Sequence, residues 1–210
     1  MKYAVFDVDG TLIDSMYVWD TAGDRYVRGY KKEPEEDLWL KLKHFSLLQA
    51  AEYLVNTYEI PRTAQEAVEE ICAQVAEEYS LKVKLKPGVA QYLEKLKNLD
   101  IPMCVATASD ASYIYEALKR LDVAKYFQNV YTCGSVGYAK DDVRFFEAVA
   151  QQTGTKASEL TVFEDALHSI RTARQAGCRV IALYDERAEL DWNEICNLAD
   201  EHYQSFLELL

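Results

Sequence analysis

The sequence predicts an α/β protein in which a doubly wound parallel sheet carries an inserted α-helical bundle. Short apolar segments alternate with helical segments along most of the chain, a pattern typical of parallel strands joined by crossover helices. Between the first apolar segment and the others, a long stretch shows only helical periodicity. We therefore expect a core domain built from residues 1–14 and 85–210, and a helical domain built from residues 15–84.

The composition is that of an ordinary globular protein, with 50% hydrophobic and 28% charged residues in a chain of 210. Acidic residues number 35 and basic residues 23, and the formal net charge of -12 disfavours nucleic acid or an anionic membrane as partner. No apolar run of about 18 residues and no signal-peptide pattern is present, so we expect a cytoplasmic protein. The five cysteines are scattered without a metal-binding spacing, which indicates reduced core side chains.

The first expected strand, Tyr3–Phe6, leads directly to two aspartates at alternate positions, Asp7 and Asp9. In an extended backbone both carboxylates would point to the same side. Gly10 then permits a sharp turn of the chain. Two carboxylates this close repel each other unless a cation or hydrogen bonds satisfy them, so the pattern favours a metal site. A calcium EF-hand loop is disfavoured by the apolar residues that follow, and an edge strand ending in an ordinary turn is the structural alternative.

Residues 15–84 are expected to form a four-helix bundle. The clearest helical periodicity is shown by Leu47, Leu48, Ala51, Leu54, Val55 and Tyr58. The pairs Ser46/Gln49 and Thr63/Glu66 have the spacing of capping boxes and would begin two of the helices. Several basic side chains of this segment either face a substrate or belong to the solvated surface, namely Arg25, Arg28, Lys41, Lys43 and His44.

Two later core strands are expected to end in polar side chains. The strand at 101–107 ends in Thr107, and Ser109 follows as the alternative candidate for a site hydroxyl. The strand at 160–163 ends in Glu164 and Asp165. Acids at the start of a helix also favour its dipole without any metal, but ligands of doubly wound sheets bind at the carboxyl ends of the strands. We therefore expect these side chains to meet Asp7 at one edge of the sheet.

The remaining core elements are a strand at 129–133, a helix from Asp141 or Asp142 to about Gln152, and a last strand at 178–183. The tail from Trp192 onward reads as helix and short connections. Lys140 follows the strand at 129–133 and a glycine-bearing loop, just before the helix. A lone lysine usually lies on the surface, so its position between strand and helix is what singles it out.

The stretch Asp7-Val8-Asp9-Gly10-Thr11 resembles the first motif of the haloacid dehalogenase-like superfamily, most of whose members are magnesium-dependent phosphohydrolases. The resemblance covers nearly the whole chain, because Thr107, Lys140 and the Glu164-Asp165 pair stand where that family has its second, third and fourth motifs. It implies a Rossmann-like core, and it makes residues 15–84 the helical cap of the branch similar to β-phosphoglucomutase and phosphoglycolate phosphatase. Asp141 departs from the family's usual pattern, which has proline after the lysine.

By that resemblance, Asp7 is the nucleophile and Asp9 the general acid and base. Thr107 and Lys140 bind the charge of the transferring phosphoryl group. The implied cofactor is Mg²⁺, with Asp7, Asp9, Glu164 and Asp165 as metal-site residues. The cap would close over the site, exclude water and recognise the leaving group.

The expected function is magnesium-dependent hydrolysis of a small phosphorylated metabolite through an aspartyl-phosphate intermediate. A sugar-phosphate mutase resembling β-phosphoglucomutase is the nearest alternative, but that enzyme carries a histidine twelve residues after the nucleophile, where this chain has Trp19. A phosphonate hydrolase with a cap lysine and a non-catalytic module that binds metal or phosphate are further alternatives. The sequence identifies neither the substrate nor the oligomeric state.

Overall fold

The computed structural model describes residues 1–42 and 45–210 and divides the chain into two compact units. One unit comprises Met1–Asp14 and Val83–Leu210, and the other comprises Ser15–Lys82. Residues 83 and 84 lie in the first unit, so the expected insertion at 15–84 extends two residues too far. The physical reason is a small antiparallel sheet in which Asp14 of β2 (Ile13–Asp14) pairs with Lys84 of β3 (Lys84–Leu85).

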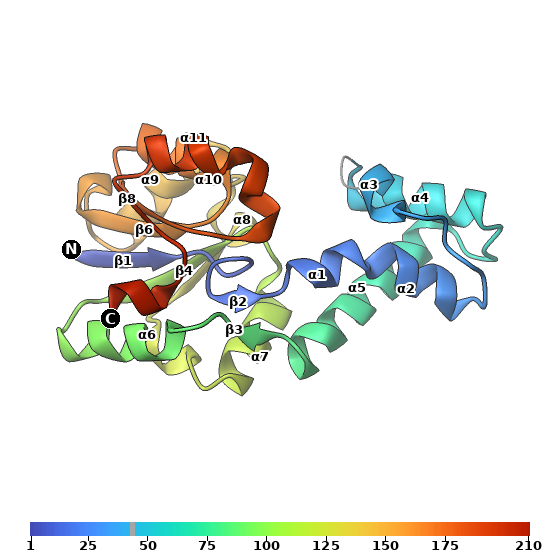
Figure 1. The fold of residues 1–210 in the computed structure, drawn as a ribbon, viewed down its shortest axis with the longest axis horizontal. Coiled ribbons are helices and arrows are strands. Elements are labelled where there is room, and N and C mark those ends of the chain that lie inside the picture. The colour runs from blue at the N-terminus through green and yellow to red at the C-terminus, as the bar shows by residue number, and fades with distance from the viewer. Residues whose placement is uncertain (43–44) are drawn as a thin grey trace. The chain divides into compact units, whose positions relative to one another are not determined.

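The first unit is built around a six-stranded sheet in the order β5-β4-β1-β6-β7-β8, and every neighbouring pair is parallel (Figure 1). This confirms the predicted α/β class with a doubly wound parallel sheet. The strands are β1 (Tyr3–Phe6), β4 (Met103–Thr107), β5 (Val130–Thr132), β6 (Leu160–Glu164), β7 (Arg179–Leu183) and β8 (Glu201–Tyr203). The first strand of the chain lies between β4 and β6, in the interior of the sheet.

Strand β8 corrects the expectation that the tail holds only helix and connections. It consists of Glu201, His202 and Tyr203, which pair with the end of β7 at one edge of the sheet. An edge strand is solvated along one side and does not need the apolar run that marks a buried parallel strand. The sixth strand therefore carries no hydrophobic signal in the sequence.

Helices cover both faces of this sheet. Figure 1 shows α9, α10 and α11 on one face, and α6 and α7 on the other. The helices of this unit are α6 (Val89–Asn98), α7 (Ala111–Arg120), α8 (Cys133–Val136), α9 (Val143–Gln152), α10 (Leu167–Gln175) and α11 (Trp192–Leu198). Short 3-10 helices are η1 (Ala124–Tyr126), η2 (Ala157–Glu159), η3 (Glu186–Asp191) and η4 (Phe206–Leu209).

The alternation of side chains along the strands fills a core on each face. Val5 of β1 and Val162 of β6 belong to the buried cluster that includes Phe145 of α9 and Ile195 of α11. On the opposite face, the rings of Phe6 and Phe163 stack with centroids 4.4 Å apart and pack with Tyr92 and Phe206. Burial on both faces explains why β1 is apolar at every position until it ends, where Asp7 begins the polar sequence.

The second unit is entirely helical in its described residues and contains five helices rather than the expected four. They are α1 (Met16–Asp20), α2 (Ala22–Gly29), α3 (Leu38–Leu42), α4 (Leu47–Thr57) and α5 (Ala64–Leu81). Both predicted capping boxes are present: Ser46 with Gln49 begins α4, and Thr63 with Glu66 begins α5. In the part of the chain that the structure describes, no helix has the length and apolar character needed to cross a membrane.

Candidate active site

The predicted site residues of the first unit gather at the carboxyl ends of three adjacent strands, β4, β1 and β6. Asp7 follows β1, Thr107 ends β4, and Glu164 ends β6 and is followed by Asp165. The ladder between β1 and β6 extends beyond the strands, because the Asp7 amide donates to the Phe163 carbonyl at 3.0 Å. Parallel pairing therefore brings together segments that are more than 150 residues apart in sequence.

Lys140 is buried and holds two of these acids together. Its Nζ donates to Asp7 Oδ1 and to Glu164 Oε1, each at 2.6 Å. The lysine comes from the segment that follows β5 and α8 and precedes α9. Burial lowers its pKa, but the charges of Asp7 and Glu164 raise it more, so the ammonium group stays charged. The structure thus places this predicted residue within the acid cluster and not on the surface.

Glu164 uses both of its carboxylate oxygens for bonds within the protein. While Oε1 accepts from Lys140, Oε2 accepts from the backbone amides of Asp165 and Ala166, each at 2.7 Å. Burial alone would raise its pKa, but Lys140 and these hydrogen bonds hold the pKa of Glu164 below its usual value. Glu164 is therefore an ionised acid whose position is fixed by three donors.

Asp165 is held against the loop that follows β1. Its Oδ1 accepts from the Thr11 hydroxyl at 2.8 Å. Gly10, the residue before Thr11, has φ +82°, and a Cβ added to it would lie 2.4 Å from Asp165 Oδ2. Glycine is required here for the left-handed backbone and for the close approach of this carboxylate.

The acids Asp7, Glu164 and Asp165 form a buried group whose ligand atoms all lie within 4.8 Å of one another. Lys140 supplies one positive charge to three carboxyl groups. Burial raises the pKa of Asp7 to about 8, with the charges of Glu164 and Asp9 adding to the effect and Lys140 opposing it. Burial and the charges of Glu164 and Asp7 likewise raise the pKa of Asp165 well above its usual value. The negative charge of these carboxylates is only partly balanced by Lys140, and carboxylate oxygens are hard ligands. The group therefore fits a divalent cation such as Mg²⁺.

Asp9 is tied to the segment that follows β4. Its Oδ2 accepts from the Ser109 hydroxyl at 2.6 Å, and the Ser109 amide donates to Thr107 Oγ1 at 3.1 Å. Thr107 is fully buried. The two hydroxyl residues considered as alternatives from the sequence therefore occupy different places. Ser109 contacts Asp9, whereas Thr107 is buried and contacts the Ser109 amide.

The basic residues considered in the helical segment are engaged within their own unit. Arg25 donates to the Val18 carbonyl and pairs with Glu78, Arg28 pairs with Glu33, and Lys41 pairs with Glu35. Trp19 donates its indole N–H to the Tyr79 hydroxyl at 3.1 Å. Lys43 and His44 lie outside the described residues.

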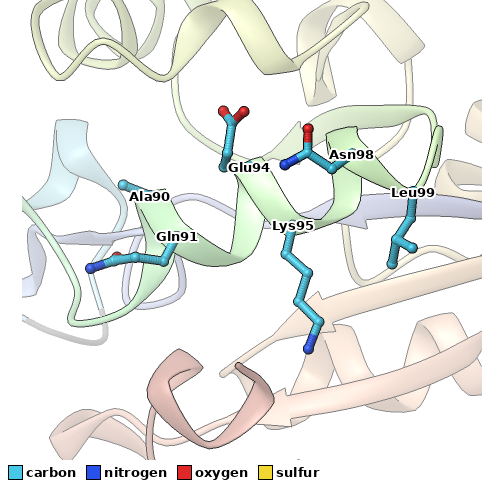
Figure 2. A pocket seen from close by; sticks show the side chains of 6 residues that line it. All are labelled: Ala90, Gln91, Glu94, Lys95, Asn98 and Leu99. Atoms are coloured by element: carbon cyan, nitrogen blue, oxygen red, sulfur yellow. The ribbon is translucent and has the colours of Figure 1, made fainter.

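Sequence reasoning missed Thr11, whose hydroxyl holds Asp165, and Lys86, whose ammonium group reaches the Gly10 carbonyl oxygen at 2.6 Å. Thr11 stands inside the recognised motif and could have been found there, but nothing around Lys86 in the sequence indicates its contact. A separate hollow on the same unit is lined along α6 by Ala90, Gln91, Glu94, Lys95, Asn98 and Leu99 (Figure 2). None of the acids described above belongs to that lining.

Comparison with known proteins identifies the family. The model of the haloacid dehalogenase-like hydrolases matches residues 4–183. A phosphorylated carbohydrates phosphatase of Thermotoga maritima is 25% identical over 213 residues, covering 99% of each chain. The validoxylamine A 7'-phosphate phosphatase of Streptomyces hygroscopicus subsp. limoneus is 27% identical over 87% of this chain and 85% of its own length.

Solved structures share the fold over the full length of the chain. A HAD hydrolase from Entamoeba histolytica superimposes with a TM-score of 0.80 at 22% identity, covering all of this chain and 96% of the other. CbbY of Rhodobacter sphaeroides, solved with xylulose-(1,5)bisphosphate, gives a TM-score of 0.80 at 17% identity with the same coverage. At these identities the likeness concerns the fold.

Proposed function

This chain belongs to the haloacid dehalogenase-like hydrolases and is a phosphohydrolase, and from that premise we propose that it hydrolyses a small phosphate monoester with Mg²⁺ as cofactor. The observation that carries the proposal is the buried group of Asp7, Glu164 and Asp165 with Lys140 bonded to two of its members. Three acids with one ammonium group form a site that attracts a divalent ion and a phosphate together.

The metal ligands we propose are the carboxylates of Asp7 and Asp165 and the backbone carbonyl of Asp9. Glu164 is occupied by Lys140 and two backbone amides, so its proposed role is to hold the lysine beside Asp7. Bound Mg²⁺ would balance the charge of the acids and of the phosphate oxygens.

In the proposed mechanism, a carboxylate oxygen of Asp7 attacks phosphorus and the bond from phosphorus to the leaving oxygen breaks. Asp9 donates a proton to that oxygen, and an aspartyl-phosphate on Asp7 remains. Asp9, now a carboxylate, then takes a proton from a water molecule, which attacks phosphorus and releases phosphate from Asp7. Lys140, the Thr107 hydroxyl and the amides of Val8 and Asp9 stabilise the charge on the phosphoryl oxygens.

The substrate class we propose is a sugar phosphate or a similar small phosphorylated metabolite. Relatives named for phosphorylated carbohydrates and for validoxylamine A 7'-phosphate support this class. In this proposal the helical unit, residues 15–82, acts as the cap that recognises the leaving group.

A screen of sugar phosphates, nucleotides and p-nitrophenyl phosphate, with Mg²⁺ and with EDTA, tests the proposal. We expect metal-dependent phosphate release that Asp7→Asn abolishes, while the exposed control Asp122→Asn retains it. Borohydride reduction of a quenched reaction should convert Asp7 to homoserine, detected by mass spectrometry. No turnover of any ester with Mg²⁺ would contradict the proposal. Conversion of β-glucose 1-phosphate to glucose 6-phosphate faster than phosphate release would identify a mutase instead.

A further inference from the structure

Lys86 makes a three-way contact beside the acid site that the proposed chemistry does not use. Its Nζ donates to the Gly10 carbonyl at 2.6 Å, to the Tyr184 carbonyl at 2.8 Å and to Asp185 Oδ2 at 2.9 Å. Only 18% of its side chain is exposed. Three acceptors satisfy all three N–H bonds of an ammonium group, so this contact is more specific than a mobile surface ion pair.

The backbone of Lys86 holds the same loop. Its amide donates to the Leu12 carbonyl at 3.0 Å, immediately after the pairing of Leu85 with Ile13. Two bonds from one residue therefore connect the segment leaving β3 with the loop between β1 and β2. The other two acceptors of the ammonium group lie just beyond the end of β7, so the loop is anchored to the sheet on a second side.

The anchored loop lies directly against Asp165. Gly10 lies between Asp9 and Thr11, and Thr11 bonds Asp165 at 2.8 Å. A Cβ on Gly10 would lie 2.4 Å from Asp165, so a small shift of the Gly10 peptide brings the loop against the carboxylate or takes the Thr11 hydroxyl away from it.

The ammonium group also pairs with an acid. Asp185 pairs with Lys86 and accepts from the Arg187 amide at 3.0 Å. Burial and the charges of Glu164 and Asp7 raise the pKa of Asp165, and Asp185 contributes further in the same direction. Lys86 therefore balances the charge of Asp185, an acid that follows β7 and acts on Asp165.

We propose that Lys86 is a positioning residue, whose ammonium group fixes the Gly10 peptide and through it the placement of Asp9, Thr11 and Asp165. It acts through the loop and touches neither substrate nor metal. The consequence for catalysis rests on the proposed phosphatase function, whereas the effect on the loop does not.

The test compares Lys86→Met with the wild-type chain by two measurements. Hydrogen exchange of the segment 8–13, whose Leu12 and Ile13 amides donate to the Val8 carbonyl, is expected to become about tenfold faster in Lys86→Met. On the best substrate of the screen, kcat should fall about 10- to 100-fold while KM changes by less than about threefold, because misplacement of the reacting groups affects the transition state more than binding.

Lys95→Met is the matched control. Lys95 lies on α6 and donates to the main-chain oxygens of Leu209 and Leu210 at 2.8 Å each, so its removal also deletes bonds to main-chain oxygens of the same unit. Figure 2 shows its side chain extending from α6, in the hollow lined by that helix. We expect exchange at 8–13 and kcat to stay near wild type in this variant.

Unchanged exchange at 8–13 in Lys86→Met would overturn the proposal, as would an acceleration equal to that in Lys95→Met. If the wild-type chain cleaves no ester but exchange at 8–13 still accelerates in Lys86→Met alone, the positioning role stands and the proposed phosphatase function fails.

Discussion

Gly10 is constrained twice at the residue scale, by its backbone conformation and by its neighbour. We expect Gly10→Ala to weaken Mg²⁺ binding by about tenfold or more, because the new Cβ must displace Asp165. The positive φ adds strain of about 1–2 kcal/mol to the folded state. Calorimetric titration with Mg²⁺ measures the first effect and urea unfolding of the metal-free protein measures the second.

Gly177→Ala separates these two effects. Gly177 has φ +85°, almost the same as Gly10, but no atom lies within 4 Å of the position where its Cβ would stand. This control should lose a similar amount of stability from backbone strain and keep the wild-type affinity for Mg²⁺. Equal Mg²⁺ affinity in Gly10→Ala and the wild-type chain would show that Asp165 does not bind the ion.

Protonation of the acid group predicts how Mg²⁺ binding depends on pH. Burial raises the pKa of Asp7 to about 8 in the metal-free protein, so at neutral pH the folded state holds a proton that the unfolded chain has lost. The resulting stabilisation is present at low pH and is lost as pH rises toward 8. Because the ion requires the carboxylate, its affinity should rise by up to about tenfold per pH unit between pH 6 and 8.

Thermal unfolding with and without Mg²⁺ at pH 6 and pH 8.5 measures this dependence. The metal-free midpoint should fall as pH rises, and the increase in midpoint caused by Mg²⁺ should be larger at pH 8.5. A Mg²⁺ effect that is the same at both pH values would contradict the raised pKa of Asp7.

Site residues that a local sequence pattern marks could be predicted, whereas contacts between residues far apart in sequence could not. Asp7, Asp9 and Asp165 stand directly after apolar strands, and Lys140 stands at a recognisable place between strand and helix, so a local pattern marks each of them. The bonds from Ser109 to Asp9 and from Lys86 to Gly10 join residues 100 and 76 positions apart. Only the folded sheet brings such pairs together, and no local pattern marks them.

At the scale of elements, the capping box of α5 is a testable contribution to stability. The Thr63 side chain accepts from the Glu66 amide, and the Glu66 carboxylate accepts from the Thr63 amide at 2.7 Å. Thr63→Ala should lower the free energy of unfolding by about 1 kcal/mol, whereas Thr63→Ser retains the hydroxyl and should lose less. Urea unfolding of the full chain gives both values, and equal losses would show that the hydroxyl is not the stabilising group.

The elements that the sequence predicted well are the ones with a strong hydrophobic pattern. β1, β4, β6 and β7 are buried over most of their length and read as apolar runs. The short pair β2 and β3 and the edge strand β8 have two or three residues each, and their burial is mixed. Their existence depends on pairing with a neighbour and not on composition. This is why the sequence extended the helical unit by two residues and missed β8.

At the scale of the whole molecule, the net charge of -12 opposes the approach of a phosphate ester. Added salt screens this long-range repulsion more than it screens the short contacts inside a buried site. We expect kcat/KM to rise about two- to fivefold when ionic strength increases from about 10 to 150 mM at saturating Mg²⁺. Steady-state kinetics with a singly and a doubly charged ester provide the comparison, and a fall with salt for both would mean that local positive charge governs the encounter.

The antiparallel pairing of Ile13 with Leu85 and of Asp14 with Lys84 means that the chain leaves the sheet-bearing unit and returns to it at neighbouring positions. In topological terms, residues 15–82 are a single insertion between the paired strands β2 and β3. A short turn could join the two ends without altering any strand of the parallel sheet, and so could a helical segment taken from another relative. Under the proposed function, exchanging residues 15–82 would therefore change the choice of substrate and leave the acids and Lys140 at the strand ends in place.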